Sequence, residues 1–176
     1  MAGLSVFLLA MKLEPSSKYL QSEQQPQETP ANMSHRIFSL AALTVLELSP
    51  PDMVEVAARA GYSHVGLRLE PATPEEHHFP LVRDAGLRRQ TAERLRDSGI
   101  KVLDIEILRL KPETRVADFD ALLAVGAEFG ASELLVAGND PDQARMTDNF
   151  AALCDLAAKY GIYPHLEFMP WTDAKN

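Results

Sequence analysis

The chain has 176 residues, of which 46% are hydrophobic and 24% charged, an ordinary balance for a globular protein with one core. Its net charge of -8 and pI near 5.1 argue against a surface that follows a phosphate backbone, so no nucleic-acid partner is expected. The single cysteine, Cys154, excludes an intrachain disulfide and is predicted to be a small buried side chain in a reducing compartment, the cytoplasm.

The N-terminal residues lack the pattern of a folded domain. Residues 3–11 are apolar but too short to span a membrane, and no basic region precedes them, so neither membrane insertion nor secretion is expected. Residues 12–32 are rich in Gln, Glu, Ser and Pro and cannot bury enough apolar surface to become ordered. We therefore expect residues 1–34 to form a poorly ordered leader and residues 35–176 to form the folded domain.

From residue 37 onward, one unit recurs: a helix end, a glycine and a short apolar run. The glycines fall where a helix needs a left-handed residue to end. They are Gly61, Gly99, Gly130 and Gly161. The apolar runs start roughly 30 residues apart, which suits a strand, a loop, a helix and a return loop. This order predicts parallel strands joined by right-handed crossovers.

The helical segments have recognisable starts and apolar faces. Ser49 is followed by two prolines and Asp52, a typical N-cap with proline in the first turn. Further helices are predicted at about residues 87–98 and 118–129, and from about residue 147 to the last of the four glycines.

The strands are near-continuous apolar runs, which is typical of a parallel sheet covered by helices. A closed eight-stranded α/β barrel and an open doubly wound sheet both fit this pattern. No Gly-rich phosphate loop follows any strand, and polar residues recur at the strand ends, where barrels build their active sites. These residues are Thr44, Arg68, Glu70, Asp104, Glu106, Asn139, Asp140 and Glu167. The barrel is therefore favoured.

Glu167 ends the last apolar run, and Pro170 prevents that strand from continuing. A carboxylate at the mouth of a buried strand needs a cation, an arginine or a substrate to face it, although a surface Glu at a strand end is an equal alternative. His165 lies two residues earlier, so it is predicted either to contact Glu167 or to be a hydrogen-bonded interior histidine. Trp171 is predicted either to pack over a sugar face or to cover the core.

Charged side chains are also expected inside the barrel. Asp104 and Glu106 share one face of their strand and are predicted to point inward, with Arg68 as their counter-charge. This arrangement fits a structural ion pair or a sugar-binding site. His78 follows the second strand with His77, in a loop where substrate contact and plain solvent exposure are both open.

Three of these segments resemble the xylose isomerase-like sugar phosphate isomerases and epimerases, a family with the TIM-barrel fold. They are residues 103–110, 136–140 and, most specifically, 166–172, Leu-Glu-Phe-Met-Pro-Trp-Thr. The resemblance covers about residues 37–172. It implies an enzyme that transfers a proton next to a carbonyl of a sugar, or a lyase that dehydrates a cyclic keto acid or inosose on the same scaffold.

The resemblance also implies a site. In the family, a Glu, an Asp, a His and a second Glu at the ends of the last four strands hold a divalent metal such as Mn²⁺ or Mg²⁺, and Glu167 matches the first. Glu167 is thus expected to be a metal ligand and the acid or base, with Glu106, Arg68, Trp171 and His78 as substrate contacts.

The strands that would carry the other three ligands lie beyond Asn176, so the resemblance implies a partial (β/α)8 TIM barrel, α/β in class, with strands 1 to 5 and helices 1 to 4. Metal binding by this chain alone is expected to be weak or absent. Its edge strands and apolar interior would be open, and a homo-oligomer would cover them. A non-catalytic truncated module is the alternative to an enzyme.

Overall fold

The structure is a computed structural model, and it describes residues 36–175. The leader expected over residues 1–34 lies outside the described residues. Within the described part of the chain, no helix has both the length and the apolar character needed to cross a membrane.

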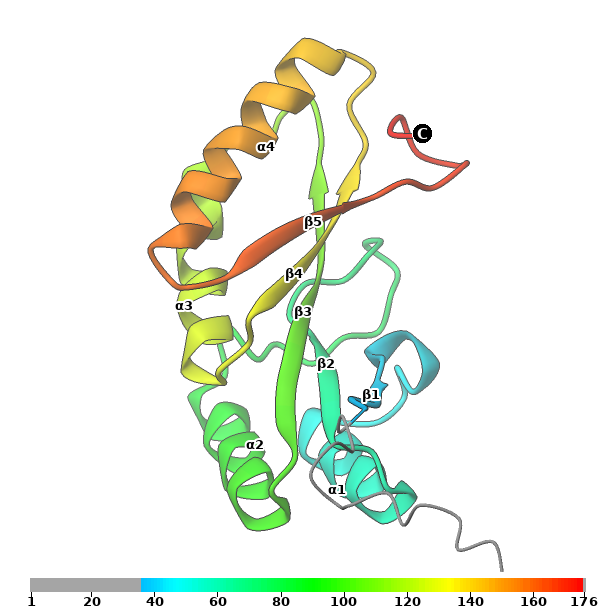
Figure 1. Cartoon of the computed structure of the whole chain (residues 1–176), viewed down its shortest axis with the longest axis vertical. Helices are drawn as coiled ribbons and strands as arrows, with labels where there is room; N and C mark the ends of the chain where they lie inside the picture. Colours follow the sequence, from blue (N-terminus) through cyan, green and yellow to red (C-terminus); the bar gives the residue numbers. More distant parts are fainter. Residues whose placement is uncertain (1–35, 176) are drawn as a thin grey trace, which may run out of the picture. The chain divides into compact units, whose positions relative to one another are not determined.

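The described chain contains a five-stranded parallel sheet with the strands in sequence order (Figure 1). The strands are β1 (Ser39–Leu40), β2 (His64–Arg68), β3 (Lys101–Leu110), β4 (Glu133–Gly138) and β5 (Tyr163–Glu167). Every neighbouring pair is parallel. The predicted partial α/β barrel of five strands is confirmed, because each strand is followed by its sequence neighbour in the sheet.

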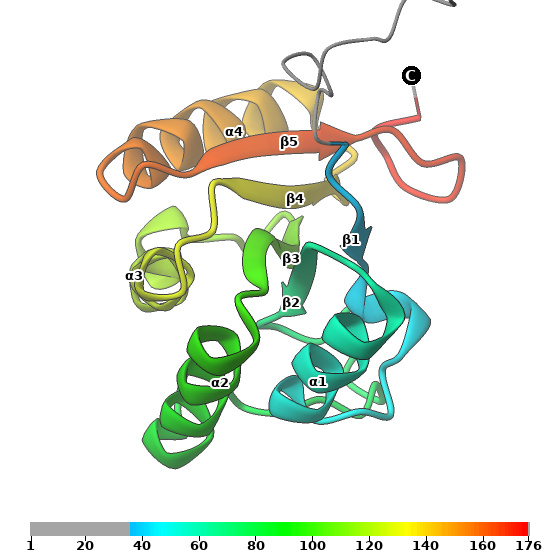
Figure 2. The same cartoon turned by 60° about the horizontal axis from the view of Figure 1, so that its bottom comes forward.

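Four α-helices lie on the outer side of the curved sheet, which leaves its inner side uncovered by helices (Figure 2). They are α1 (Pro50–Ala60), α2 (Ala85–Ser98), α3 (Asp120–Glu128) and α4 (Gln143–Ala158), with 3-10 helices η2 (Ala42–Thr44) and η3 (Val116–Phe119) before α1 and α3. Ser49 caps α1 as predicted, and Gly61 ends it with φ 83°. Such a φ is strained for any residue with a Cβ, so the glycine is required there.

Two helices begin earlier than the apolar pattern predicts. The side chain of Asp84 accepts a 2.9 Å hydrogen bond from the Leu87 N–H, so α2 starts at Ala85. Asp142 accepts a 3.1 Å hydrogen bond from the Arg145 N–H, and α4 starts at Gln143, four residues before the predicted start. The apolar periodicity missed both starts because the residues that open these helices, Ala85 and Gln143, are exposed and are held by side-chain caps.

The two faces of the sheet differ in chemistry. Alternate residues such as Leu67, Ile105 and Leu134 are in register with one another and pack with the helices in the main core. The opposite, concave face carries mainly charged side chains around a small apolar cluster of Ile107, Ala137 and Met169. The charged residues are Arg68, Asp104, Glu106, Arg109, Glu133, His165 and Glu167. The expectation of an apolar interior is therefore wrong for most of this face, because period-two alternation directs the ionisable residues away from the helices.

Candidate functional site

Glu167 lies at the carboxyl end of β5, in register with Ala137 of β4, which in turn pairs with Arg109 of β3. Arg68 ends β2 and pairs with Glu106 on the same face of the sheet, but β3 continues to Leu110, so the prediction that Glu106 lies at a strand end is wrong. Arg68 and Glu167 lie at the carboxyl ends of their strands, where α/β barrels place their chemistry, and Glu106 lies on the same face within the sheet. The Glu167 side chain is exposed and makes no hydrogen bond or ion pair within residues 36–175.

Arg68 and Glu106 form a buried pair with imperfect geometry. Their side chains are 9% and 7% exposed, and Arg68 Nε lies 3.9 Å from Glu106 Oε1 and 3.4 Å from Glu76 Oε1. Neither Arg68 Nε nor Glu106 Oε1 has a hydrogen-bond partner among the described residues. Burial raises the pKa of Glu106, and the attraction of Arg68 only partly opposes this effect.

Asp104, Glu133 and His165 continue the row of charges toward β5. Burial, with repulsion from Glu133, raises the pKa of Asp104. His165 is hydrogen-bonded to Glu133, and this contact lowers the pKa of the Glu133 carboxyl. His165 therefore contacts Glu133 on β4 and not Glu167; it is hydrogen-bonded, as the alternative predicted, but its side chain is 61% exposed and not buried.

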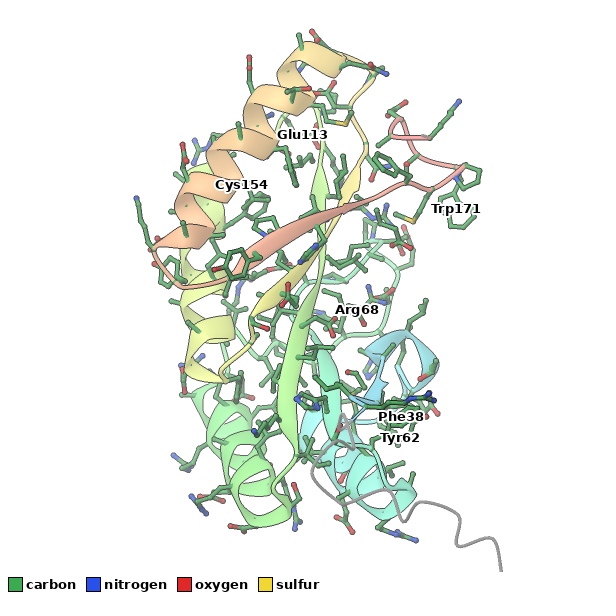
Figure 3. The ribbon with its side chains drawn as sticks, in the orientation of Figure 1. Phe38, Tyr62, Arg68, Glu113, Cys154 and Trp171 are labelled. Carbon is green, nitrogen blue, oxygen red and sulfur yellow. The ribbon has the colours of Figure 1, made fainter. Side chains whose placement is uncertain are left out.

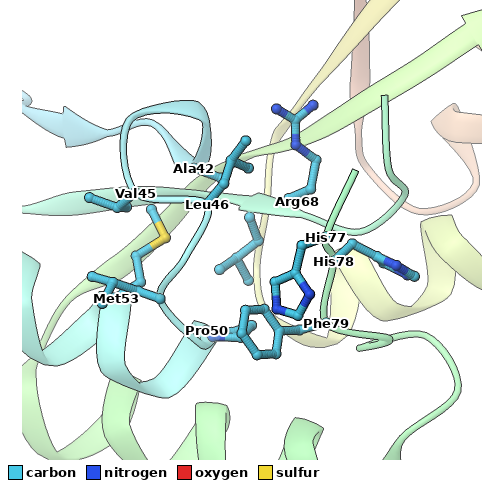
Figure 4. A pocket seen from close by; sticks show the side chains of 11 residues that line it. Ala42, Val45, Leu46, Pro50, Met53, Arg68, His77, His78 and Phe79 are labelled. Atoms are coloured by element: carbon cyan, nitrogen blue, oxygen red, sulfur yellow. The ribbon is translucent and has the colours of Figure 1, made fainter. Parts of the chain in front are cut away.

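The loop after β2 brings His78 and Arg68 to the same small pocket, about 20 Å³ in volume (Figure 4). His77 packs edge-on against Phe79 there, with ring centroids 4.9 Å apart. The pocket is lined mostly by apolar side chains and is large enough for a single water, not for a sugar. His78 thus lies near Arg68, while the Arg68 guanidinium points away from His77 and Phe79 (Figure 4).

Trp171 and Cys154 lie in different parts of the fold (Figure 3). Trp171 follows β5 and is 76% exposed, so the alternative that it covers the core is wrong. Cys154 on α4 is partly and not fully buried, and burial raises the pKa of its thiol. A thiol with a raised pKa is a poor nucleophile.

Two polar residues at the rim were not predicted as site residues. Arg109 at the end of β3 donates from Nε to the Ala72 carbonyl at 2.9 Å and from Nη1 to Asn139 Oδ1 at 2.9 Å. Glu76 reaches Arg68 from the loop after β2 and also accepts from the Ala72 N–H at 3.1 Å. The position of Arg109 near a strand end is visible in the sequence, but its partners come from distant segments.

The concave face does not contain a metal site by itself. Among residues 36–175, no three His, Cys, Asp or Glu side chains gather closely enough to hold an ion. Glu167 offers one carboxylate, whereas Mn²⁺ and Mg²⁺ need several oxygen ligands in a fixed arrangement. The described residues therefore do not fit the implied metal without ligands from elsewhere.

An open sheet of parallel strands, with every helix on its outer side and polar residues at one rim, defines part of an α/β barrel. No family model and no curated protein matches the sequence. Solved structures match the fold. A xylose isomerase domain-containing protein from Salmonella typhimurium superposes with a TM-score of 0.61 at 19% identity, over 78% of this chain and 51% of that one.

Two other solved structures have the same fold. The IolI protein, solved with a bound zinc atom, gives a TM-score of 0.59 at 19% identity over 79% of this chain and 54% of that one. A sugar phosphate isomerase/epimerase from Parabacteroides distasonis gives 0.52 at 16% identity, over 78% and 53%. The chain thus has the fold of the xylose isomerase-like TIM barrels and spans about half the length of these three proteins.

Proposed function

We propose that this chain is part of a sugar isomerase or epimerase in which Glu167 transfers a proton at the carbon next to a carbonyl. The observation that carries the proposal is the position of Glu167 at the carboxyl end of β5, at the same rim as Arg68 and on the same face of the sheet as Glu106. The names of the structural neighbours, a sugar phosphate isomerase/epimerase among them, support the same class of reaction.

The proposed chemistry uses the carboxylate as base and then as acid. Glu167 removes the proton from the carbon beside the substrate carbonyl, and the electron pair moves onto the carbonyl oxygen. Protonation of the opposite face of that carbon by a second acid gives the epimer. If Glu167 instead returns the proton to the former carbonyl carbon, while the former carbonyl oxygen gains a proton and the neighbouring hydroxyl loses one to become the new carbonyl, the isomer forms. Because Glu167 is exposed at the rim, a substrate can approach it from the concave face.

A divalent metal would polarise the carbonyl and acidify this C–H bond. Glu167 would be one of its ligands, and the others would come from outside residues 36–175 or from another chain. Trp171 and His78 are proposed as further substrate contacts, since both lie in the segments that follow the strands at this rim.

Solvent exchange tests the proposal. The full chain is incubated in D₂O with a panel of ketoses and ketose phosphates, with and without Mn²⁺, and deuterium at the carbon next to the carbonyl is followed by NMR. We expect incorporation with at least one sugar and its loss, by at least 100-fold, in Glu167→Gln. Glu113→Gln, an exposed Glu in a loop, is the matched control. Equal exchange in wild type and Glu167→Gln would overturn the assignment.

A second candidate is a non-catalytic module that assembles with a second copy of itself, and the exposed apolar side chains favour it. Among residues 36–175, seven large hydrophobic residues are exposed, and all but Val56 on α1 flank an edge strand. Ile37, Phe38 and Leu43 surround β1, and Tyr163, Phe168 and Trp171 lie on or after β5. We propose that the β5 edge of one copy meets the β1 edge of another, because one chain offers both parallel edges.

Light scattering after size exclusion tests the assembly. Wild type is expected to form a dimer at micromolar concentration, and the double change Phe168→Ser with Trp171→Ser is expected to give a monomer. Val56→Ser is the control, since it removes an exposed hydrophobic residue that lies on α1 and not on or beside an edge strand in the sequence. A monomer at every wild-type concentration would contradict the assembly. Deuterium exchange that depends on Glu167 separates the two candidates, because a non-catalytic module should show none.

A further inference from the structure

Arg68 Nε and Glu106 Oε1 are a buried donor and a buried acceptor that have no hydrogen bond among the described residues, although Glu76 lies 3.4 Å from Arg68 Nε. Both side chains are more than nine-tenths buried, with 9% and 7% exposure. Their closest approach, 3.9 Å between Nε and Oε1, is too long for a hydrogen bond, and no nitrogen of Arg68 donates to a described residue. Buried polar groups are almost always hydrogen-bonded, so this pair points to a ligand.

The spacing suits a hydroxyl group. A hydroxyl can accept from an Arg68 N–H and donate to Glu106 Oε1 at the same time, which satisfies both groups with one ligand atom. A polyol offers several such groups on adjacent carbons. The flat guanidinium presents its donors in a fixed plane and can therefore contact two neighbouring hydroxyls.

The local charge disfavours an anion. Arg68 is the only cation that the described contacts place at this point, whereas Glu76, Glu106 and Asp104 supply three carboxylates around it. A phosphate or carboxylate group would approach a net negative cluster, which repels it. An uncharged hydroxyl avoids this penalty.

We propose that Arg68 and Glu106 form a subsite for the hydroxyl groups of an uncharged polyol, so that this part of the substrate carries no phosphate. This inference rests on the proposed function, because it assumes that the concave face holds a sugar. Glu167 on β5 stands two strands from Glu106 and three from Arg68, and neighbouring strands are about 4.8 Å apart. A sugar that contacts both places must therefore extend over several carbons.

Sorbitol is the test ligand, because it is uncharged and has no carbonyl on which Glu167 could act. Saturation-transfer NMR on the full chain should show sorbitol binding that falls at least fivefold in Arg68→Met and in Glu106→Leu. Arg115→Met is the control, since Arg115 is 79% exposed and pairs only with Asp118. Inorganic phosphate should neither bind at this place nor displace sorbitol.

A wild-type titration keeps the test decisive if a variant does not fold. The amide signals of Leu67, Leu69 and Ile107 should shift when sorbitol is added to ¹⁵N-labelled protein. Absence of sorbitol binding, shifts centred elsewhere, or displacement by phosphate would each overturn the inference. Failure of the proposed function would be seen separately, as deuterium exchange that does not depend on Glu167.

Discussion

Two buried carboxylates on or just after neighbouring strands have opposite properties. Asp140, just after β4, is fully buried and accepts two 2.7 Å hydrogen bonds from Arg145 and one of 2.9 Å from the Asp142 N–H. These bonds lower its pKa. Glu106 on β3 is 7% exposed and lies 3.9 Å from Arg68 without a hydrogen bond, and burial raises its pKa.

Hydrogen bonds to the carboxylate, and not merely a nearby arginine, determine whether the pKa of a buried acid is lowered or raised. Asp140 has its partners on the first turn of α4, within a few residues, and holds that turn against β4. Glu106 has its partner on another strand and at a longer distance. The first carboxylate is structural, and the second is available to a ligand.

The largest loss of stability is expected when a side chain is removed from the main core, where the sheet packs with the helices. Leu67→Ala, next to Arg68, deletes a side chain that is 1% exposed. We expect the free energy of unfolding to fall by about 2–5 kcal/mol in urea titrations. Leu43→Ala, at a leucine that is 65% exposed, should change it little. Equal losses would mean that the core is not where the structure places it.

Arg145→Gln should cause the next largest loss in the free energy of unfolding, because it leaves the buried Asp140 without its charged donors. The pKa of Asp140 lies below its ordinary value of 3.8, so its stabilising contribution is complete above that pH and is lost as the pH falls through the folded-state pKa. The deficit of the variant should therefore be largest at pH 7 and shrink below about pH 3.8.

Chemical unfolding at several pH values checks this expectation. Arg115→Gln is the matched control, because Arg115 and Asp118 form an exposed ion pair. A deficit as small as that of the control would refute the structural role of Arg145.

Glu106→Gln should show the opposite pH dependence. The folded-state pKa of Glu106 is above its ordinary value of 4.5, so the wild type loses stability as the pH rises from about 4.5 through the raised value. Gln does not ionise. The stability of the variant relative to wild type should therefore increase with pH over this window and stay level below it.

The measurement is the same unfolding series, with the exposed Glu113→Gln as control. A relative stability that decreases with pH would show that Glu106 is held as a well-bonded carboxylate, like Asp140.

The smallest effect is expected at the exposed pair of His165 and Glu133, whose side chains are 61% and 36% exposed. His165→Gln should cost at most about 1 kcal/mol, because water and salt screen such pairs. The His165 contact lowers the pKa of Glu133. The difference in free energy of unfolding between wild type and variant should therefore be present above pH 4.5 and vanish as the pH falls through the folded-state pKa of Glu133. Addition of 1 M NaCl should remove most of it.

The four glycines illustrate what could be predicted from local sequence. Each ends a helical pattern, and Gly61, Gly99, Gly130 and Gly161 all have positive φ. Parallel strand order followed from the spacing of these units. The starts of α2 and α4 were missed because Asp84 and Asp142 act through side-chain caps, which leave no mark on the apolar pattern.

The candidate site was predictable in part. The sequence indicated correctly that Arg68 and Glu167 lie at strand ends, and parallel strands bring their ends to one rim, whereas Glu106 lies within β3, which continues to Leu110. It could not indicate that Glu76 reaches Arg68 from a loop, or that His165 contacts Glu133 and not Glu167. Such contacts join residues far apart in the chain, and side-chain direction decides them.

The sequence by itself determined the repeated strand and helix units, their glycine stops and the rim at which polar residues collect, because these depend on local backbone conformation and on period-two alternation. Only the tertiary structure decided which charges meet. It paired Arg145 closely with Asp140 and left Arg68 at a distance from Glu106, because strand register and loop path set those distances.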